Sequence, residues 1–305
     1  MPNNERVKGI GYAAGSYLLW GILPIYWKQL QSVSSLQVLG HRVVWSLVFL
    51  LLLLVITGGL AGFKTEVQGI SRQPRKVFYI IVATIMLNFN WGLYIWAVNS
   101  DRIVQTSLGY YINPLVSVLL GMFFLRERLS FWQWVAFMLA GFGVIGLTVE
   151  THSFPWVSIS LAVTFGFYGL LKKVINIGAI TGLTLETALA AVFALTYLLY
   201  VNATGSGAFH LNLSATTFWL LGAGVVTATP LILFGAGARR LPLYAVGFLQ
   251  YISPTMALLL GVLVYHEPFS RAHLLSFAVI WVGLAVFSLA HTPLLLRKQA
   301  VGQGG

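Results

Sequence analysis

Long apolar runs, separated by short polar connections, make up most of this chain of 305 residues. A helix that crosses a bilayer needs about 20 mostly apolar residues, and ten runs satisfy this requirement. The longest connection between them, 58–76, is polar and basic and contains Pro74, so we predict a plain loop there. Ten such helices account for about 200 residues, which excludes an additional soluble domain. The pattern predicts an all-α membrane protein with spanning helices at 9–30, 34–57, 77–99, 103–124, 131–149, 155–171, 182–201, 214–237, 243–264 and 271–291.

The composition agrees with this class of protein. Only 8% of the residues are charged and 58% are hydrophobic, with a mean hydropathy of +0.85, whereas a soluble domain has about 25% charged residues. The chain contains no cysteine, which excludes disulfides and thiolate metal sites. The net charge of +11 comes from small clusters between the apolar runs, so it indicates topology rather than nucleic-acid binding.

Lysine and arginine are distributed unequally between alternate connections. Positive residues accumulate on the cytoplasmic side of a bilayer, so the inequality predicts that both termini are cytoplasmic. One side holds Lys28, Arg102 and Arg271, and Arg42 falls inside a run. The other side holds Arg6, Lys8, Lys64, Arg72, Arg75, Lys76, Arg126, Arg128, Lys172, Lys173, Arg239, Arg240, Arg297 and Lys298.

A spaced motif occurs twice, 140 residues apart. Tyr111-Ile-x-Pro, Gly121 and Glu127-x-x-Ser correspond to Tyr251-Ile-x-Pro, Gly261 and Glu267-x-x-Ser. The duplication predicts two related halves of five helices, 1–150 and 151–292, followed by a cytoplasmic tail, 293–305. Because five is odd, the second half must enter the membrane from the opposite face, as in many transporters with inverted repeats. Glu127 is then expected on the cytoplasmic side and Glu267 on the external side.

Four ionisable residues fall within predicted spans, where such groups are costly and usually paired or functional. Lys28 ends the first span and either reaches the outer headgroups or contacts a ligand. His41 and Arg42 are adjacent in the second span, so their side chains diverge by about 100° and one can face a cavity. A structural ion pair is the alternative for Arg42. For Glu186 we expect an interfacial position, the alternatives being a link to Arg42 or proton coupling.

Polar and aromatic residues accompany the prolines of the repeated helices. Proline removes a backbone donor, and the freed groups must be satisfied by protein or by a water-filled cavity. Pro114 and Pro254 therefore suit a binding site whose neighbouring residues are Tyr111, Asn113, Gln250 and Tyr251.

The third predicted span adds Asn90 and Trp91 to these candidates. Interhelical hydrogen bonding and interfacial aromatic belts are the alternative explanation for such residues. Gly11-x-x-x-Gly15 and the glycines at 141, 143 and 146 have the spacing of helix contacts. No ATP-binding, serine-nucleophile or His-x-x-x-His metal motif is found.

The motifs together resemble the EamA family of the drug/metabolite transporter superfamily, and within it the RarD group. The similar segments are His41-Arg-Val-Val-Trp45, Asn90-Trp91, Ser107-Leu-Gly-Tyr-Tyr-Ile-Asn-Pro114 and Gly247-Phe-Leu-Gln-Tyr-Ile-Ser-Pro254. The resemblance implies a ten-helix bundle of the bacterial inner membrane with a central cavity. It also implies that the second helix is peripheral, which weakens the case for His41 and Arg42. It places near the cavity Trp20, Asn90, Tyr111, Asn113, Tyr168, Gln250 and Tyr251.

We therefore predict a secondary transporter that exports a small metabolite or drug by alternating access. The alternative is a flippase or a membrane-embedded enzyme acting on a lipid-linked intermediate. The expected partners are the substrate and the lipid bilayer, without nucleic acid, cofactor or metal, and the chain is expected to be a monomer or homodimer. The predicted substrate-binding residues are Trp20, Lys28, His41, Arg42, Asn90, Trp91, Tyr111, Asn113, Tyr168, Gln250 and Tyr251.

Overall fold

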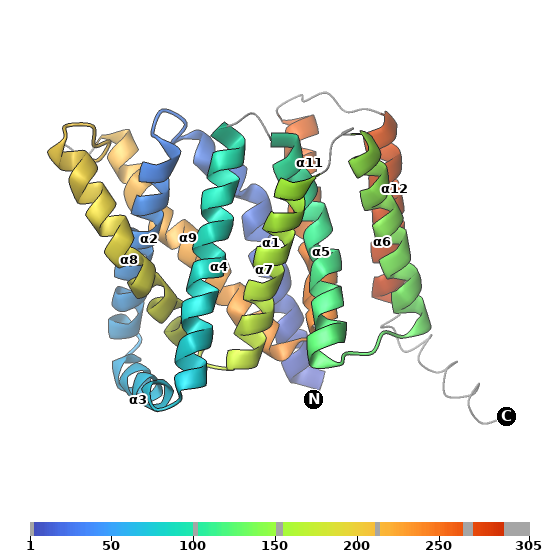
Figure 1. The fold of residues 1–305 in the computed structure, drawn as a ribbon, viewed down its shortest axis with the longest axis horizontal. Coiled ribbons are helices and arrows are strands. Elements are labelled where there is room, and N and C mark those ends of the chain that lie inside the picture. The colour runs from blue at the N-terminus through green and yellow to red at the C-terminus, as the bar shows by residue number, and fades with distance from the viewer. Residues whose placement is uncertain (1–2, 100–102, 151–154, 211–213, 265–270, 290–305) are drawn as a thin grey trace.

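The computed structural model of the chain describes residues 3–99, 103–150, 155–210, 214–264 and 271–289. These residues form helices and no strand, and most of the helices stand side by side in Figure 1. The motif residues Glu267 and Ser270 lie outside the described residues, as does the predicted tail. The helices are α1 (Asn3–Lys28), α2 (Ser35–Ile56), α3 (Leu60–Ser71), α4 (Pro74–Asn99), α5 (Ile103–Leu125), α6 (Phe131–Glu150), α7 (Trp156–Ile175), α8 (Ala179–Ala203), α9 (Ala215–Arg240), α10 (Leu243–Gln250), α11 (Ile252–Leu263) and α12 (Arg271–Leu289).

Eight helical segments of the described chain are long and apolar enough to cross a membrane. Seven lie in α2 and in α4 to α9, and the eighth, Leu243–Leu260, combines α10 with most of α11. The helix α1 is long but begins with charged residues, and α12 has a shorter apolar segment, Leu274–Leu289. The prediction of an all-helical, multi-span protein is confirmed.

The predicted loop at 58–76 is wrong in one respect, because it contains the helix α3. Phe63, Glu66, Val67 and Ile70 are its more buried residues, and their spacing of three and four residues is that of one helix face. Figure 1 shows α3 lying across the end of the bundle near the N-terminus. A single amphipathic helix on the surface was concealed by the polar and basic composition of this connection.

The prediction of one ninth span is also incomplete, since the helix is interrupted at Tyr251 between α10 and α11. Pro254 has no N–H to donate to the carbonyl four residues earlier, which is that of Gln250, the last residue of α10. At Pro114, the counterpart in the first half, α5 continues without interruption. The two copies of the motif therefore have different local structures.

Most close helix packing joins the first half of the chain to the second. The helices α2 and α8, α5 and α10, and α6 and α12 pack as pairs of sequence counterparts. The remaining large contacts are also between halves, and they occur in corresponding sets. The contact of α1 with α9 corresponds to that of its counterpart α7 with α4. The contact of α1 with α10 and α11 corresponds to that of α7 with α5. Each half thus supplies the packing partners of the other.

Two glycines show how closely helices of the two halves approach. A Cβ atom built on Gly224 of α9 would lie 2.2 Å from the backbone carbon of Trp45 on α2. A Cβ on Gly143 of α6 would lie 2.6 Å from the Ile280 side chain on α12. Gly11, in contrast, has no atom within 4 Å of such a Cβ, so it does not form the contact suggested by its spacing.

The end of the bundle that carries the N-terminus, α3 and the α5–α6 connection is called here the basic end, because it holds the clusters at Arg126, Lys172 and Arg239. Contacts between the halves close this end. Glu5 of α1 binds Arg240 of α9, with Oε2 3.0 Å from Nε. Glu66 of α3 accepts hydrogen bonds of 2.5 Å from the Gly178 N–H and the Thr181 hydroxyl, at the start of α8.

Glu127 of the repeated motif also lies at the basic end. Its carboxylate accepts the backbone N–H groups of Leu243 at 2.7 Å and Tyr244 at 3.0 Å, which begin α10. A negative charge at a helix N-terminus satisfies unpaired donors and interacts favourably with the helix dipole. The motif carboxylate therefore ties the first half of the chain to the interrupted helix of the second half.

Replacing Glu127 by alanine is expected to lower the unfolding free energy by about 1–2 kcal/mol, because two backbone donors lose their acceptor. Thermal unfolding of the detergent-purified protein measures the effect. Arg128→Ala, which changes an exposed residue next to Glu127, is the matched control. Equal melting temperatures for the two variants would show that the cap does not stabilise the fold.

Candidate functional site

The guanidinium of Arg42 lies between two indole rings. Its Cζ is 4.6 Å from the ring centroid of Trp27 on α1 and 4.8 Å from that of Trp91 on α4. Its Nε donates a hydrogen bond of 3.0 Å to the hydroxyl of Thr227 on α9. These four residues, which we call the Arg42 site, come from four helices and from both halves of the chain. Stacking on aromatic faces is favourable for arginine and strongest when water is excluded.

No carboxylate among the described side chains forms an ion pair with Arg42. The four acidic side chains that the structure places, Glu5, Glu66, Glu127 and Glu186, are all bonded to other groups. The predicted alternative of a structural ion pair for Arg42 therefore has no partner in the described part of the chain. An enclosed cation without an anion is costly, so this site favours an anionic ligand.

Two tyrosines lie near the Arg42 site. The phenol groups of Tyr94 on α4 and Tyr110 on α5 are close enough to interact electrostatically with Arg42. Their ring centroids are 6.1 Å apart, and 37% of Tyr94 and 47% of Tyr110 is exposed. The helices α4 and α5 thus each place a phenol group near the guanidinium.

His41 points away from Arg42, as their adjacent positions on one helix predict. Its ring is buried and stacks on Phe209, with centroids 5.2 Å apart and planes inclined by 28°. The Nδ1 atom has no hydrogen-bond partner among the described residues. Trp45, one turn along α2, also packs against Phe209, at 5.8 Å. His41 is thus separated from the Arg42 site and packs under the connection that precedes α9.

The two repeated tyrosines lie against each other at the contact between α5 and α10–α11. The Tyr111 hydroxyl donates to the Pro254 carbonyl at 3.0 Å, and the Tyr251 hydroxyl donates to the Tyr111 carbonyl at 3.2 Å. Both rings are buried, and neither hydroxyl is directed at the Arg42 site. Asn113 and Gln250 beside them are also buried, and the Asn113 Oδ1 atom has no partner in the described structure.

Asn90 connects two helices. Its Nδ2 donates at 2.8 Å to the Leu161 carbonyl and at 2.8 Å to the Thr164 hydroxyl, both on α7. This arrangement is the interhelical hydrogen bonding that the sequence offered as the alternative to substrate contact. Of the adjacent pair Asn90-Trp91, only the tryptophan contacts Arg42.

Trp20 and Tyr168 belong to an aromatic cluster that joins α1, α7 and α9. Trp20 lies 5.7 Å from Phe165 and 5.7 Å from Phe234, and Tyr168 stacks on Phe234 at 5.9 Å. Lys28 is exposed at the end of α1, opposite the basic end. The structure therefore divides most of the predicted residues among the Arg42 site, the tyrosine contact and this aromatic cluster, and places Lys28, His41 and Asn90 outside all three.

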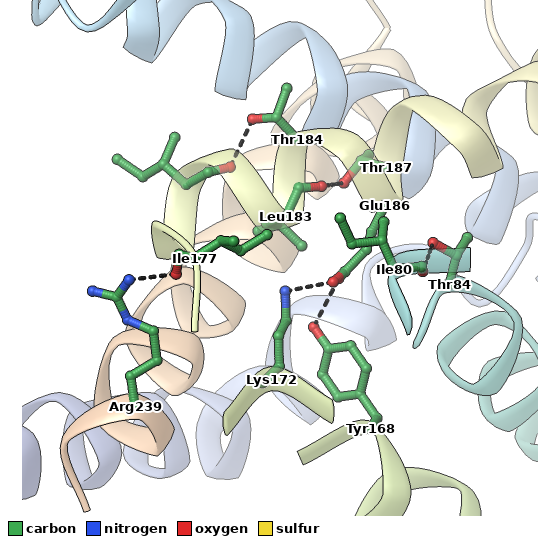
Figure 2. Close-up of polar contacts among 11 residues, drawn as sticks. Ile80, Thr84, Tyr168, Lys172, Ile177, Leu183, Thr184, Glu186, Thr187 and Arg239 are labelled. Carbon is green, nitrogen blue, oxygen red and sulfur yellow. Dashed lines mark hydrogen bonds and ion pairs between the residues drawn. The ribbon is translucent and has the colours of Figure 1, made fainter. Parts of the chain in front are cut away.

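Glu186 forms a buried polar cluster with two residues of α7. Its carboxylate accepts from the Lys172 ammonium at 2.7 Å and from the Tyr168 hydroxyl at 3.2 Å, and Figure 2 shows both groups pointing at it. Only 2% of Glu186 and 6% of Lys172 is exposed. The expected interfacial position for Glu186 is wrong, because the lysine supplies a charge partner inside the protein.

Two cavities adjoin this cluster. The inner cavity lies between α2, α4, α8 and α9, and Trp91 and Thr227 of the Arg42 site line it. The basic-end cavity is lined by Lys172, Gly178 and Arg239. Glu186 borders both cavities.

Comparison with known proteins places these features in a family. Residues 7–149 match the model of the EamA-like transporter family. The chain is 43% identical over 295 residues to the "Uncharacterized transporter YojE" of Bacillus subtilis, covering 95% of this chain and 96% of that protein. It is 39% identical over 287 residues to "Protein RarD" of Escherichia coli, covering 94% and 96%. The chain belongs to the EamA-like transporter family.

The EamA-like transporter also has relatives at lower identity. It is 31% identical over 295 residues to the "Chloramphenicol-sensitive protein RarD" of Pseudomonas aeruginosa, covering 96% of this chain and 97% of that protein. A solved crystal structure that is 20% identical superposes with a TM-score of 0.69 and covers 92% of this chain and 97% of its own. That likeness shows the fold alone.

Three residues that build the sites of this EamA-like transporter were not predicted from its sequence. Trp27 belongs to none of the motifs found in the sequence, and Thr227 is one of several threonines in an apolar helix. Lys172 was assigned to the positive cluster that sets orientation. Partners on different helices leave no spacing signal in one sequence, so only the fold brings these side chains to Arg42 and Glu186.

Proposed function

We propose that this EamA-like transporter is a secondary transporter that exports a small amphiphilic carboxylate across the bacterial inner membrane by alternating access. The observation that carries the proposal is the Arg42 site, an enclosed guanidinium between Trp27 and Trp91 that has no carboxylate partner among the described side chains. Arginine can bind a carboxylate in a bidentate manner, while the indoles enclose an apolar body.

The packing of the two halves supports alternating access. Contacts between helices occur in corresponding sets across the halves, as an inverted repeat of ten helices would produce. With the basic end on the cytoplasmic side, the Glu127 and Glu66 hydrogen bonds close the cytoplasmic end in this structure. Exchange of the two halves' conformations would then open that end and close the opposite one.

The names of the relatives support a transporter over the alternative of a flippase or an enzyme for lipid-linked intermediates. The geometry agrees, because Glu186 and two residues of the Arg42 site, Trp91 and Thr227, line one cavity between helices. An enzyme of the membrane face would be expected to gather several ionisable groups near the headgroups.

A ligand screen by thermal unfolding tests the proposal. The purified protein is heated with aromatic and aliphatic amino acids, aromatic acids, nucleosides and chloramphenicol, and each acid is compared with its methyl ester. We expect one class of acid to raise the melting temperature with concentration, and its ester to have no effect. That acid should then exchange across proteoliposomes containing the protein. Equal stabilisation by acid and ester, or no exchange of any compound, would contradict the proposal.

A further inference from the structure

The Glu186 cluster is the polar link between two consecutive helices that otherwise make little contact. Lys172 and Tyr168 belong to α7, and Glu186 belongs to α8. Within the described structure α7 packs against α4, α5, α9 and α10, whereas α8 packs against α2, α3, α4 and α9. The pair α7–α8 is not among the closely packed helices. The carboxylate of Glu186 therefore joins two helices that do not pack closely against each other.

The carboxylate also lies between the two cavities. On one side is the inner cavity with Trp91 and Thr227, the residues that contact Arg42. On the other side is the basic-end cavity with Arg239, whose guanidinium donates to the Ile177 carbonyl (Figure 2). Glu186 is the residue that the linings of the two cavities share.

A buried ion pair is an expensive way to join two helices, and apolar residues of similar size are often as stabilising. Ionisable groups inside membrane spans are usually functional. We propose that Glu186 is a proton-binding site and that a proton bound there releases the bridge to Lys172 and widens the basic-end cavity. The inference rests on the proposed transport function and names the proton as its coupling ion.

The proton exchange is simple in chemical terms. Water in the basic-end cavity transfers a proton to a carboxylate oxygen of Glu186, and the carboxylic acid forms without any other bond being broken. The ionic hydrogen bond of 2.7 Å to Lys172 then loses its negative partner. Lys172 is left as a buried cation, which is costly, so its ammonium moves toward water and α7 separates from α8. Deprotonation restores the bridge.

Other ionisable groups on the neighbouring helices have separate partners. Arg239 on α9 binds the Ile177 carbonyl, and Glu66 on α3 binds the start of α8. On the same helix as Lys172, Lys173 donates to the Leu241 carbonyl and lies 3.9 Å from Glu127. The remaining groups on the helices packed against α8 are His41 and Arg42 on α2, Lys64 on α3, Arg75, Lys76, Tyr79 and Tyr94 on α4, and Arg240 on α9.

Cysteine labelling tests the proposal without a substrate, because the chain has no cysteine of its own. Ile175 is 2% exposed and lines the basic-end cavity, and Val174 beside it is 45% exposed. The maleimide labelling rate of an Ile175→Cys variant is divided by that of a Val174→Cys variant. The ratio removes the pH dependence that the two thiols share. Burial raises a thiol pKa, so burial of the cysteine at 175 would by itself lower the ratio as the pH falls, which is opposite to the expected change.

We expect the labelling ratio to rise about tenfold as the pH is lowered and Glu186 is protonated, a coupling of ordinary size. Glu186→Gln, which imitates the protonated acid, is added to both cysteine variants. Their labelling ratio should then have its high, low-pH value at every pH. Adding Glu66→Gln changes the α3 carboxylate that binds the start of α8. It removes a contact at the basic end, so it should shift the ratio equally at every pH and leave the tenfold response to pH intact. A ratio independent of pH, or a response that Glu66→Gln abolishes, would overturn the proposal.

Tyr168→Phe provides a second variant if Glu186→Gln does not fold. Loss of the hydroxyl removes a donor that stabilises the ionised carboxylate, so the midpoint of the labelling change should move to higher pH. An unchanged midpoint would contradict the assignment to Glu186. Because no ligand is added, failure of the labelling experiment is distinct from failure of the proposed carboxylate transport, which the acid and ester comparison measures.

Discussion

Replacing Gly224 by alanine should leave little folded protein. A Cβ at this position would lie 2.2 Å from the Trp45 carbon and 2.4 Å from its oxygen, which are backbone atoms of α2. No change of rotamer can relieve this contact, so α2 and α9 must move apart. The Ser46 hydroxyl would also be displaced from the Gly224 carbonyl, to which it donates at 3.0 Å.

We expect the Gly224→Ala change to cost at least about 3 kcal/mol, the upper part of the usual range for overpacking. The measurement is the yield of monodisperse protein and its melting temperature in detergent. Gly11→Ala is the matched control, since nothing lies within 4 Å of its Cβ, and its stability should stay equal or rise by up to about 1 kcal/mol. A Gly224→Ala protein as stable as this control would mean that α2 and α9 are not in close backbone contact.

Replacing Arg42 by alanine should abolish transport without lowering the stability of the fold, in contrast to Gly224→Ala. The guanidinium has no carboxylate partner among the described residues, so its removal leaves no buried anion uncompensated. Loss of the two indole contacts is offset by removal of an enclosed charge. The melting temperature should therefore stay close to that of the unchanged protein.

Binding of the carboxylate should weaken at least about 30-fold in Arg42→Ala, because truncating one partner of a buried charge pair costs about 2 kcal/mol or more. Titration of the acid and its methyl ester by thermal unfolding measures this change. Arg42→Lys should give an intermediate affinity, since lysine keeps the charge without the planar fork. If Arg42→Ala still prefers the acid over the ester, Arg42 is not the anion site.

The spanning helices could be predicted because a bilayer imposes a minimum apolar length, which a single sequence displays directly. The helix α3 could not be recognised in this way, since only Phe63, Val67 and Ile70 mark its apolar face. The interruption at Tyr251 was also hidden, because Pro114 and Pro254 share one motif but only the second breaks its helix. Whether the proline of this motif interrupts its helix depends on the packing around it.

Arg42 could be selected from sequence because charged residues are scarce inside spans, and its divergence from His41 followed from helix geometry. The structure also gives Glu186 a buried partner, Lys172 on another helix, which the sequence did not indicate. Proton coupling was one of the alternatives that the sequence left open for this residue. The repeated tyrosines gave the strongest sequence signal, yet they contact each other rather than Arg42. Repetition here marks the junction of the halves.

Because each half of the chain packs mainly against the other, the helices that are synthesised first lack most of their packing partners during synthesis. The helices α1, α2 and α6 pack mainly against α9, α8 and α12, which the ribosome produces later. Chains are synthesised at about 5–20 residues per second, so the early helices wait in the bilayer for many seconds before their neighbours arrive. Until then their packing surfaces face lipid or the insertion machinery. A chain that stops after α6 should consequently be a target for membrane quality control.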